Sequence, residues 1–97
     1  MTQGKGKGQT VRRTLQIKNR LGLHARAAAQ FVQTAKQYSA DVSVTKEGQT
    51  IDGKSIIGLM MLAAACGSSI EVAAEGADAV AALAAIEALV DRKFDED

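Results

Sequence analysis

The spacing of apolar residues changes repeatedly along this chain of 97 residues, and this alternation limits the folds open to it. A spacing of two is typical of half-buried strands, and a spacing of three to four is typical of amphipathic helices. Strands are therefore expected at residues 10–17, 41–45, 49–51 and 70–74, and helices at residues 25–36, 55–64 and 78–90. The order β-α-β-β-α-β-α predicts an α+β fold, with three helices on one face of a four-stranded antiparallel sheet.

Single residues mark where several of these elements lie. Arg13 interrupts the apolar face of the first strand, which indicates a strand that either frays or lies at the edge of the sheet. The tripeptide at residues 46–48 (KEG) favours a hairpin turn between the second and third strands. Ser55 suits the N-cap of the second helix. Gly58 costs stability inside that helix, so its presence indicates that another element approaches closely there.

The single histidine, His24, lies where the first strand region gives way to the first helix. A helix N-terminus has unpaired N–H groups and a partial positive charge, and it binds phosphate well. His24 is thus a nucleophile beside an anion site, with Arg26 two residues further on. Gly22 is expected to give the loop the geometry that directs the imidazole. No other segment offers comparable chemistry.

The composition excludes several classes of protein. One histidine and one cysteine, Cys66, cannot supply the four ligands of a zinc site, so zinc is not expected. No other metal and no organic cofactor is expected either. No apolar run is long enough to span a bilayer and no signal peptide is visible, so the expected location is cytoplasmic. Residues 10–93 are expected to form one domain. Residues 1–9 are expected to form a flexible tail, and residues 94–97 a frayed acidic tail.

The charges are distributed unevenly along the sequence. Residues 1–40 contain eight basic and no acidic residues, whereas residues 41–97 contain four basic and eleven acidic ones. A positive field around His24 would favour a phosphate group and attract acidic partner surfaces. The alternative is a solvated basic face without such a purpose, and the sequence leaves both interpretations open.

Two segments resemble the HPr family, the phosphocarriers of the bacterial phosphotransferase system. Residues 22–26 (GLHAR) and 28–32 (AAQFV) resemble the family's active-site segment, and residues 53–62 (GKSIIGLMML) resemble the segment around its regulatory serine. The similarity covers residues 10–93, and the family's fold is an open-faced β-sandwich of the same element order. Residues 19–22 (NRLG) and 94–97 (FDED) are closer to the family's nitrogen-related members. Ala27 stands where the family usually has a proline. Alanine is the best helix former, so the helix should tolerate this exchange.

The resemblance implies a carrier without turnover of its own, hence not an enzyme. His24 would accept a phosphoryl group at Nδ1 from phospho-Enzyme I, which is charged from phosphoenolpyruvate, and pass it to an EIIA-type protein. The amides of Ala25 and Arg26 and the guanidinium of Arg26 would hold the phosphate oxygens. The carrier would serve sugar uptake, nitrogen-related regulation, or both.

The resemblance also implies a regulatory site and a docking surface on the second helix. Ser55 would be phosphorylated by HPr kinase/phosphorylase, which is compatible with its use as an N-cap. Ile56, Ile57 and Met60 would form an exposed apolar patch for partners; the alternative is that they belong to the core, where Leu59 and Leu62 are expected.

Two other classes of function compete with a phosphocarrier. One is a regulatory binding module, controlled by phosphorylation of Ser55 or His24 and without phosphotransfer flux. The other is a small basic nucleic-acid-binding domain, which the scarcity of aromatic residues and the acidic second half argue against. Nothing in the sequence requires more than a monomer.

Overall fold

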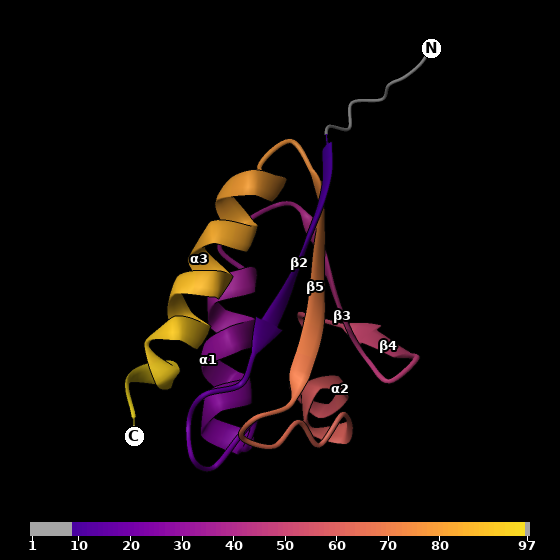
Figure 1. Ribbon diagram of the computed structural model, residues 1–97. Coiled ribbons are helices and arrows are strands. Elements are labelled where there is room, and N and C mark those ends of the chain that lie inside the picture. The colour runs from indigo at the N-terminus through magenta and orange to yellow at the C-terminus, as the bar shows by residue number, and fades with distance from the viewer. Residues whose placement is uncertain (1–8, 97) are drawn as a thin grey trace.

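Residues 9–96 of the computed structural model form one antiparallel sheet with helices packed against it (Figure 1). The predicted order β-α-β-β-α-β-α is confirmed. The elements are the strands β2 (Gln9–Gln16), β3 (Asp41–Lys46), β4 (Gln49–Asp52) and β5 (Ser69–Gly76), the helices α1 (Ala25–Ala35), α2 (Ile56–Met61) and α3 (Ala79–Asp91), and a short turn, η1 (Lys93–Asp95). No helix in this part of the chain has both the length and the hydropathy to cross a bilayer.

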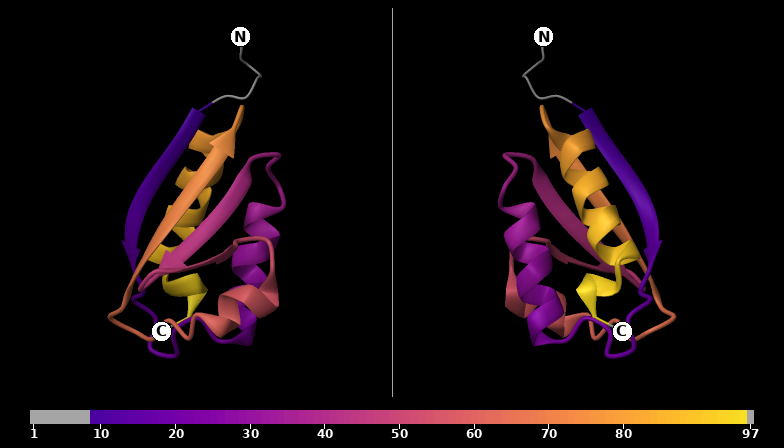
Figure 2. Two further views of the ribbon diagram at one scale, coloured as in Figure 1. Left: turned by 90° about the vertical axis from the view of Figure 1, so that its right-hand side faces the viewer. Right: turned by 90° about the vertical axis from the view of Figure 1, so that its left-hand side faces the viewer.

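The strands lie in the order β2-β5-β3-β4, and all neighbours are antiparallel. Alternation places apolar residues on one face, where Leu15 lies opposite Ile70 and Val44 lies opposite Val72. Helices α1 and α3 cover this face and leave the other face of the sheet open (Figure 2). Helix α2 packs against α1 and β4. The start of α1, helix α2 and η1 all lie at the same end of the sheet (Figures 1 and 2).

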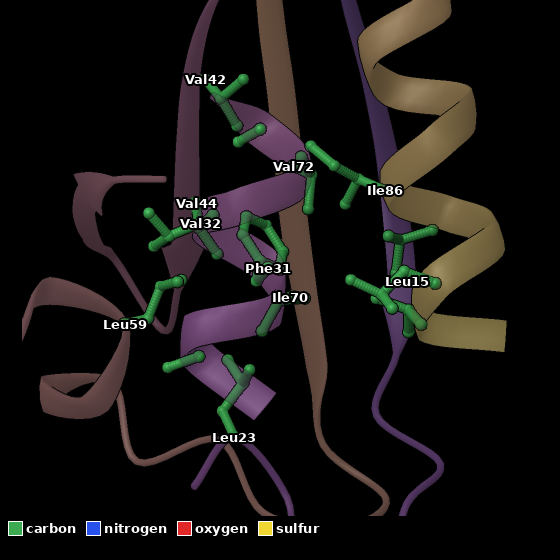
Figure 3. Close-up of a cluster of buried hydrophobic side chains, with 14 of the residues drawn as sticks. Leu15, Leu23, Phe31, Val32, Val42, Val44, Leu59, Ile70, Val72 and Ile86 are labelled. Atoms are coloured by element: carbon green, nitrogen blue, oxygen red, sulfur yellow. The ribbon is translucent and has the colours of Figure 1, made fainter. Parts of the chain in front are cut away.

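The core between sheet and helices fixes the position of α1. Phe31 of α1 is completely buried, and the side chains of Val72 and Ile86 lie in the same cluster (Figure 3). Complete burial of a side chain of this size contributes about 1.5–3 kcal/mol. The helix that begins at His24 is therefore anchored to the sheet through its buried face.

Two expectations about element placement are confirmed, and a helix boundary is wrong. Strand β2 is an edge strand, and its Arg13 forms an ion pair of 3.1 Å with Glu87 of α3. A Cβ on Gly58 would lie 3.2 Å from the Cβ of Ile51, so β4 does approach α2 closely.

Helix α2, expected to continue to residue 64, ends at Met61. Ala63 has a left-handed φ of 51°, which ends the helical path.

Asp78, which is far from it in the sequence, binds the connection between α1 and β3. It precedes α3 but makes no side-chain cap. Its carboxylate instead accepts hydrogen bonds of 2.8 Å from the backbone amides of Ser39 and Ala40. The bond from Ser39 is the main cause of a lowered Asp78 pKa; burial opposes it, and the bond from Ala40 adds to it.

This lowered pKa predicts a pH-dependent stability. A carboxyl group with a lower pKa in the folded state stabilises the fold above its unfolded-state pKa, and this contribution is lost as the pH falls through the folded value. The free energy of unfolding should therefore decrease below about pH 4, the ordinary range of an aspartate. Asp78→Asn should flatten this decrease in urea titrations at several pH values. If the free energy of unfolding of the variant fell with pH as steeply as that of the wild type, this interpretation would be contradicted.

The acidic segment after α3 was expected to be frayed, but the structure shows it ordered through residue 96. Phe94 is only 1% exposed and joins the core. Its burial returns the chain toward the start of α1 and brings Glu96 beside His24. The first expected tail, at residues 1–9, lies outside the described residues except for Gln9, which begins β2.

Candidate functional site

His24 is the N-cap of α1, with an extended backbone (φ −75°, ψ 179°). Its side chain makes no cap hydrogen bond, and the first turn contains no acidic residue. The first-turn amides and the positive end of the helix dipole are therefore not neutralised by a side chain of that turn. The His24 side chain is 28% exposed, so the ring is accessible from solvent.

The loop before His24 is held at both ends by hydrogen bonds. The side-chain amide of Asn19, which is completely buried, donates to the carbonyl of Gly22 at 2.7 Å. The amide of Leu23 donates to the carbonyl of Ala64 at 2.9 Å. Gly22 has a φ of +69°, and a Cβ there would lie 2.5 Å from the Ala64 oxygen. This loop therefore requires glycine, as expected.

Gly22→Ala should lower the free energy of unfolding by about 2 kcal/mol or more. A left-handed backbone costs a residue with a side chain roughly 1–2 kcal/mol, and the clash with the Ala64 carbonyl adds to that cost. Gly48→Ala is the matched control, because Gly48 also has a positive φ (+84°) but has nothing within 4 Å of its added Cβ. Urea denaturation compares the two variants. Equal losses would contradict a role for close approach at Gly22.

Glu96 also lines the site, and the sequence did not reveal it. Its Oε2 lies 2.7 Å and its Oε1 3.1 Å from Nε2 of His24. Asn19 donates a longer bond of 3.4 Å to Oε1. The hydrogen bond from His24 is the main cause of a lowered Glu96 pKa; burial opposes it, and Asn19 and the charge of Arg26 add to it.

An unusual backbone path brings Glu96 to this position. Lys93, Phe94 and Asp95 have consecutive left-handed φ values of 59°, 54° and 60°. Each such residue costs roughly 1–2 kcal/mol. Burial of Phe94 offsets about 1.5–3 kcal/mol of that cost. The contact spans 72 residues of sequence, so no local pattern signals it.

The site is an open concavity of about 650 Å³. Its lining residues are Arg20, Leu21, His24, Ala25, Arg26 and Glu96. Among the basic residues of the first half of the chain, Arg13 and Lys18 instead pair with acidic residues of α3. The structure thus places Arg20 and Arg26 at the histidine. An imidazole, a helix N-terminus and guanidinium groups in one concavity suit an anionic group such as phosphoryl.

An exposed apolar patch lies on α2. The predicted members Ile56, Ile57 and Met60 are 40%, 72% and 45% exposed, so they do not belong to the core. Met61, at 64%, extends this surface beyond the predicted residues. Leu59 and Leu62 are buried, as expected. Leu21, at 69% exposed, adds an apolar side chain to the concavity itself. The role of these side chains in docking stays a prediction.

Ser55 is the N-cap of α2, as predicted. Its Oγ accepts a hydrogen bond of 3.0 Å from the amide of Gly58. The side chain is half-buried. The segment that follows α2 contacts the loop before His24, because the carbonyl of Ala64 accepts a hydrogen bond from the amide of Leu23. Ser55 and His24 therefore lie on two elements that pack together, at the same end of the sheet (Figure 1).

The known proteins that are similar to this chain belong to one family. The family described as "PTS HPr component phosphorylation site" matches residues 11–92. Phosphocarrier protein HPr of Neisseria meningitidis serogroup A is 48% identical over 86 residues, or 89% of this chain and 97% of that protein. Phosphocarrier protein NPr of Klebsiella oxytoca is 43% identical over 89 residues, or 91% of this chain and 99% of that protein. The crystal structure of HPr-C-His from Thermoanaerobacter tengcongensis superposes with a TM-score of 0.87 at 41% identity, covering 90% of this chain and 98% of that one.

Proposed function

Because the chain belongs to the HPr family, whose members are phosphocarriers of the phosphotransferase system and not enzymes, we propose that it carries a phosphoryl group on His24. In this proposal His24 accepts the group from phospho-Enzyme I and passes it to an EIIA-type protein. One observation carries the proposal: a partly exposed imidazole lies at the uncapped N-terminus of α1, in a concavity that Arg26 also lines.

The proposed roles follow from what each group offers. Phosphoryl transfer between two nucleophiles depends mainly on positioning and on neutralising charge. The first-turn amides of Ala25 and Arg26 would meet the phosphate oxygens, and the Arg26 guanidinium would close over them. Arg26 is exposed, so this clamp is light. A light clamp suits a carrier, because the group must leave as readily as it arrives.

We assign docking of both partners to the patch formed by Ile56, Ile57, Met60 and Met61. An exposed apolar surface on a small domain favours protein contacts, and methionine adapts to partners of different shape. Helix α2 packs against α1, so a partner seated on α2 lies close to His24. Transfer to an EIIA-type protein of the sugar branch and to one of the nitrogen-related branch would show which branch is served.

Ser55 is the proposed site of control by HPr kinase/phosphorylase. A phosphate at the N-terminus of α2 is electrostatically tolerated there, so the helix need not unfold. The added negative charge would stand beside the apolar patch and weaken docking of Enzyme I. Incubation with such a kinase should give acid-stable phosphoserine at Ser55. If no phosphoserine forms at this position, the assignment is wrong.

The carrier function itself is tested with Enzyme I and labelled phosphoenolpyruvate. Phosphohistidine is acid-labile and phosphoserine is acid-stable, so acid treatment separates the two candidate sites. We expect label that depends on Enzyme I, is lost in acid, and moves to an added EIIA-type protein. A chain that takes no acid-labile label would instead support a regulatory binding module without flux.

A further inference from the structure

The starting observation is the geometry between Glu96 and the histidine ring. Both carboxylate oxygens lie within hydrogen-bond distance of Nε2, at 2.7 Å and 3.1 Å. Asn19, which is completely buried, donates a hydrogen bond to one of these oxygens at 3.4 Å. The carboxylate is therefore placed by two contacts and by the buried side chain of Phe94 that precedes it.

This contact determines which ring nitrogen carries the proton. An ionised carboxylate accepts hydrogen bonds and cannot donate them. Nε2 must therefore be the protonated nitrogen that donates to Glu96. In a neutral imidazole the other nitrogen, Nδ1, then holds the free lone pair. The hydrogen bonds of the ring to residues 9–96 run through Nε2, so this contact leaves Nδ1 free to react.

We propose that Glu96 is a positioning residue for phosphoryl transfer: it holds the His24 ring in the Nε2–H tautomer and keeps Nδ1 as the attacking atom. This proposal deepens the proposed function and rests on it. The family match ends at residue 92, so it does not include Glu96. The residue does not contact the attacking nitrogen and acts only through the far side of the ring.

The transfer step can be written with its charges balanced. The lone pair of Nδ1 attacks phosphorus, and an N–P bond forms. The bond from phosphorus to Enzyme I breaks, and its electron pair leaves with Enzyme I. The proton stays on Nε2, so the phosphorylated ring carries a positive charge. Glu96 faces that nitrogen and compensates the charge as it develops, in the way that a carboxylate orients and stabilises a catalytic imidazole elsewhere.

The test compares Glu96→Ala and Glu96→Gln with Asp95→Asn. Asp95 is the matched control, because it is the neighbouring carboxylate but pairs with Arg92 at 3.0 Å. The first readout is the ¹⁵N spectrum of the imidazole, which reports the tautomer without any partner protein. We expect essentially pure Nε2–H in the wild type and in Asp95→Asn. The Nδ1–H form should become detectable in Glu96→Ala and Glu96→Gln, because a glutamine amide can match either tautomer.

The second readout is the rate of phosphorylation by phospho-Enzyme I. Glu96 would orient the ring and compensate the charge that develops on it, so we expect a loss of about 10-fold in Glu96→Ala. Asp95→Asn should keep the wild-type rate. An unchanged tautomer in Glu96→Ala, or an equal rate loss in Asp95→Asn, would overturn the proposal. A wild-type chain that takes no acid-labile phosphate would overturn the proposed function instead, and the tautomer measurement would still stand.

Discussion

His24→Ala should abolish acid-labile phosphorylation by Enzyme I. The chain contains one histidine, so no second imidazole can replace the lost nucleophile. Loss of an attacking group typically lowers a rate by at least about 10³-fold. The measurement is transfer of label from phosphoenolpyruvate through Enzyme I, with acid treatment of each sample.

The fold should survive this substitution. His24 makes no side-chain cap to α1, so alanine removes no hydrogen bond from the helix. Ser55→Ala is the matched control, because it removes the other candidate acceptor and should keep the full acid-labile label. Acid-labile phosphate on folded His24→Ala would contradict the assignment.

Ile57→Glu should slow transfer from Enzyme I by about 100-fold without unfolding the protein. Ile57 is 72% exposed, so a charged side chain there meets water in the free protein. In a docked complex the same carboxylate would be desolvated against an apolar partner surface, and central interface residues often contribute 2 kcal/mol or more. Initial rates at several carrier concentrations, with thermal unfolding in parallel, give both quantities.

Val80→Glu provides the matched control for this prediction. Val80 is another exposed aliphatic residue, at 56%, but it lies in the first turn of α3 and not on α2. Its substitution should leave transfer unchanged. A variant Ile57→Glu that transfers at the wild-type rate would contradict docking on the patch, and one that fails to fold would contradict the exposed position of Ile57.

The fold was predictable because its determinants are local. Apolar spacing identifies each strand and helix, Arg13 marks an edge strand, and Ser55 marks an N-cap. The end of α2 was not predictable in the same way. The helical pattern continues past Met61, but Ala63 takes a left-handed φ, and the helix ends three residues before the expected residue 64.

The candidate site was predictable only in part, for a related reason. His24, Ala25 and Arg26 are neighbours in sequence, so the strand-to-helix junction alone brings them together. Glu96 reaches the ring through a tertiary path set by the burial of Phe94. From sequence, four consecutive residues that end in three acidic ones resemble a solvated tail. The single phenylalanine among them is the signal that this segment returns to the core.

The most direct test of the carrier mechanism is to identify the nitrogen that carries the phosphoryl group. The ¹⁵N-labelled protein is phosphorylated with Enzyme I and phosphoenolpyruvate, and the coupling between phosphorus and the ring nitrogens of His24 is measured. A phosphoryl group on Nδ1, with Nε2 still protonated, is the predicted result. Phosphate on Nε2, or on no ring nitrogen at all, would contradict the account.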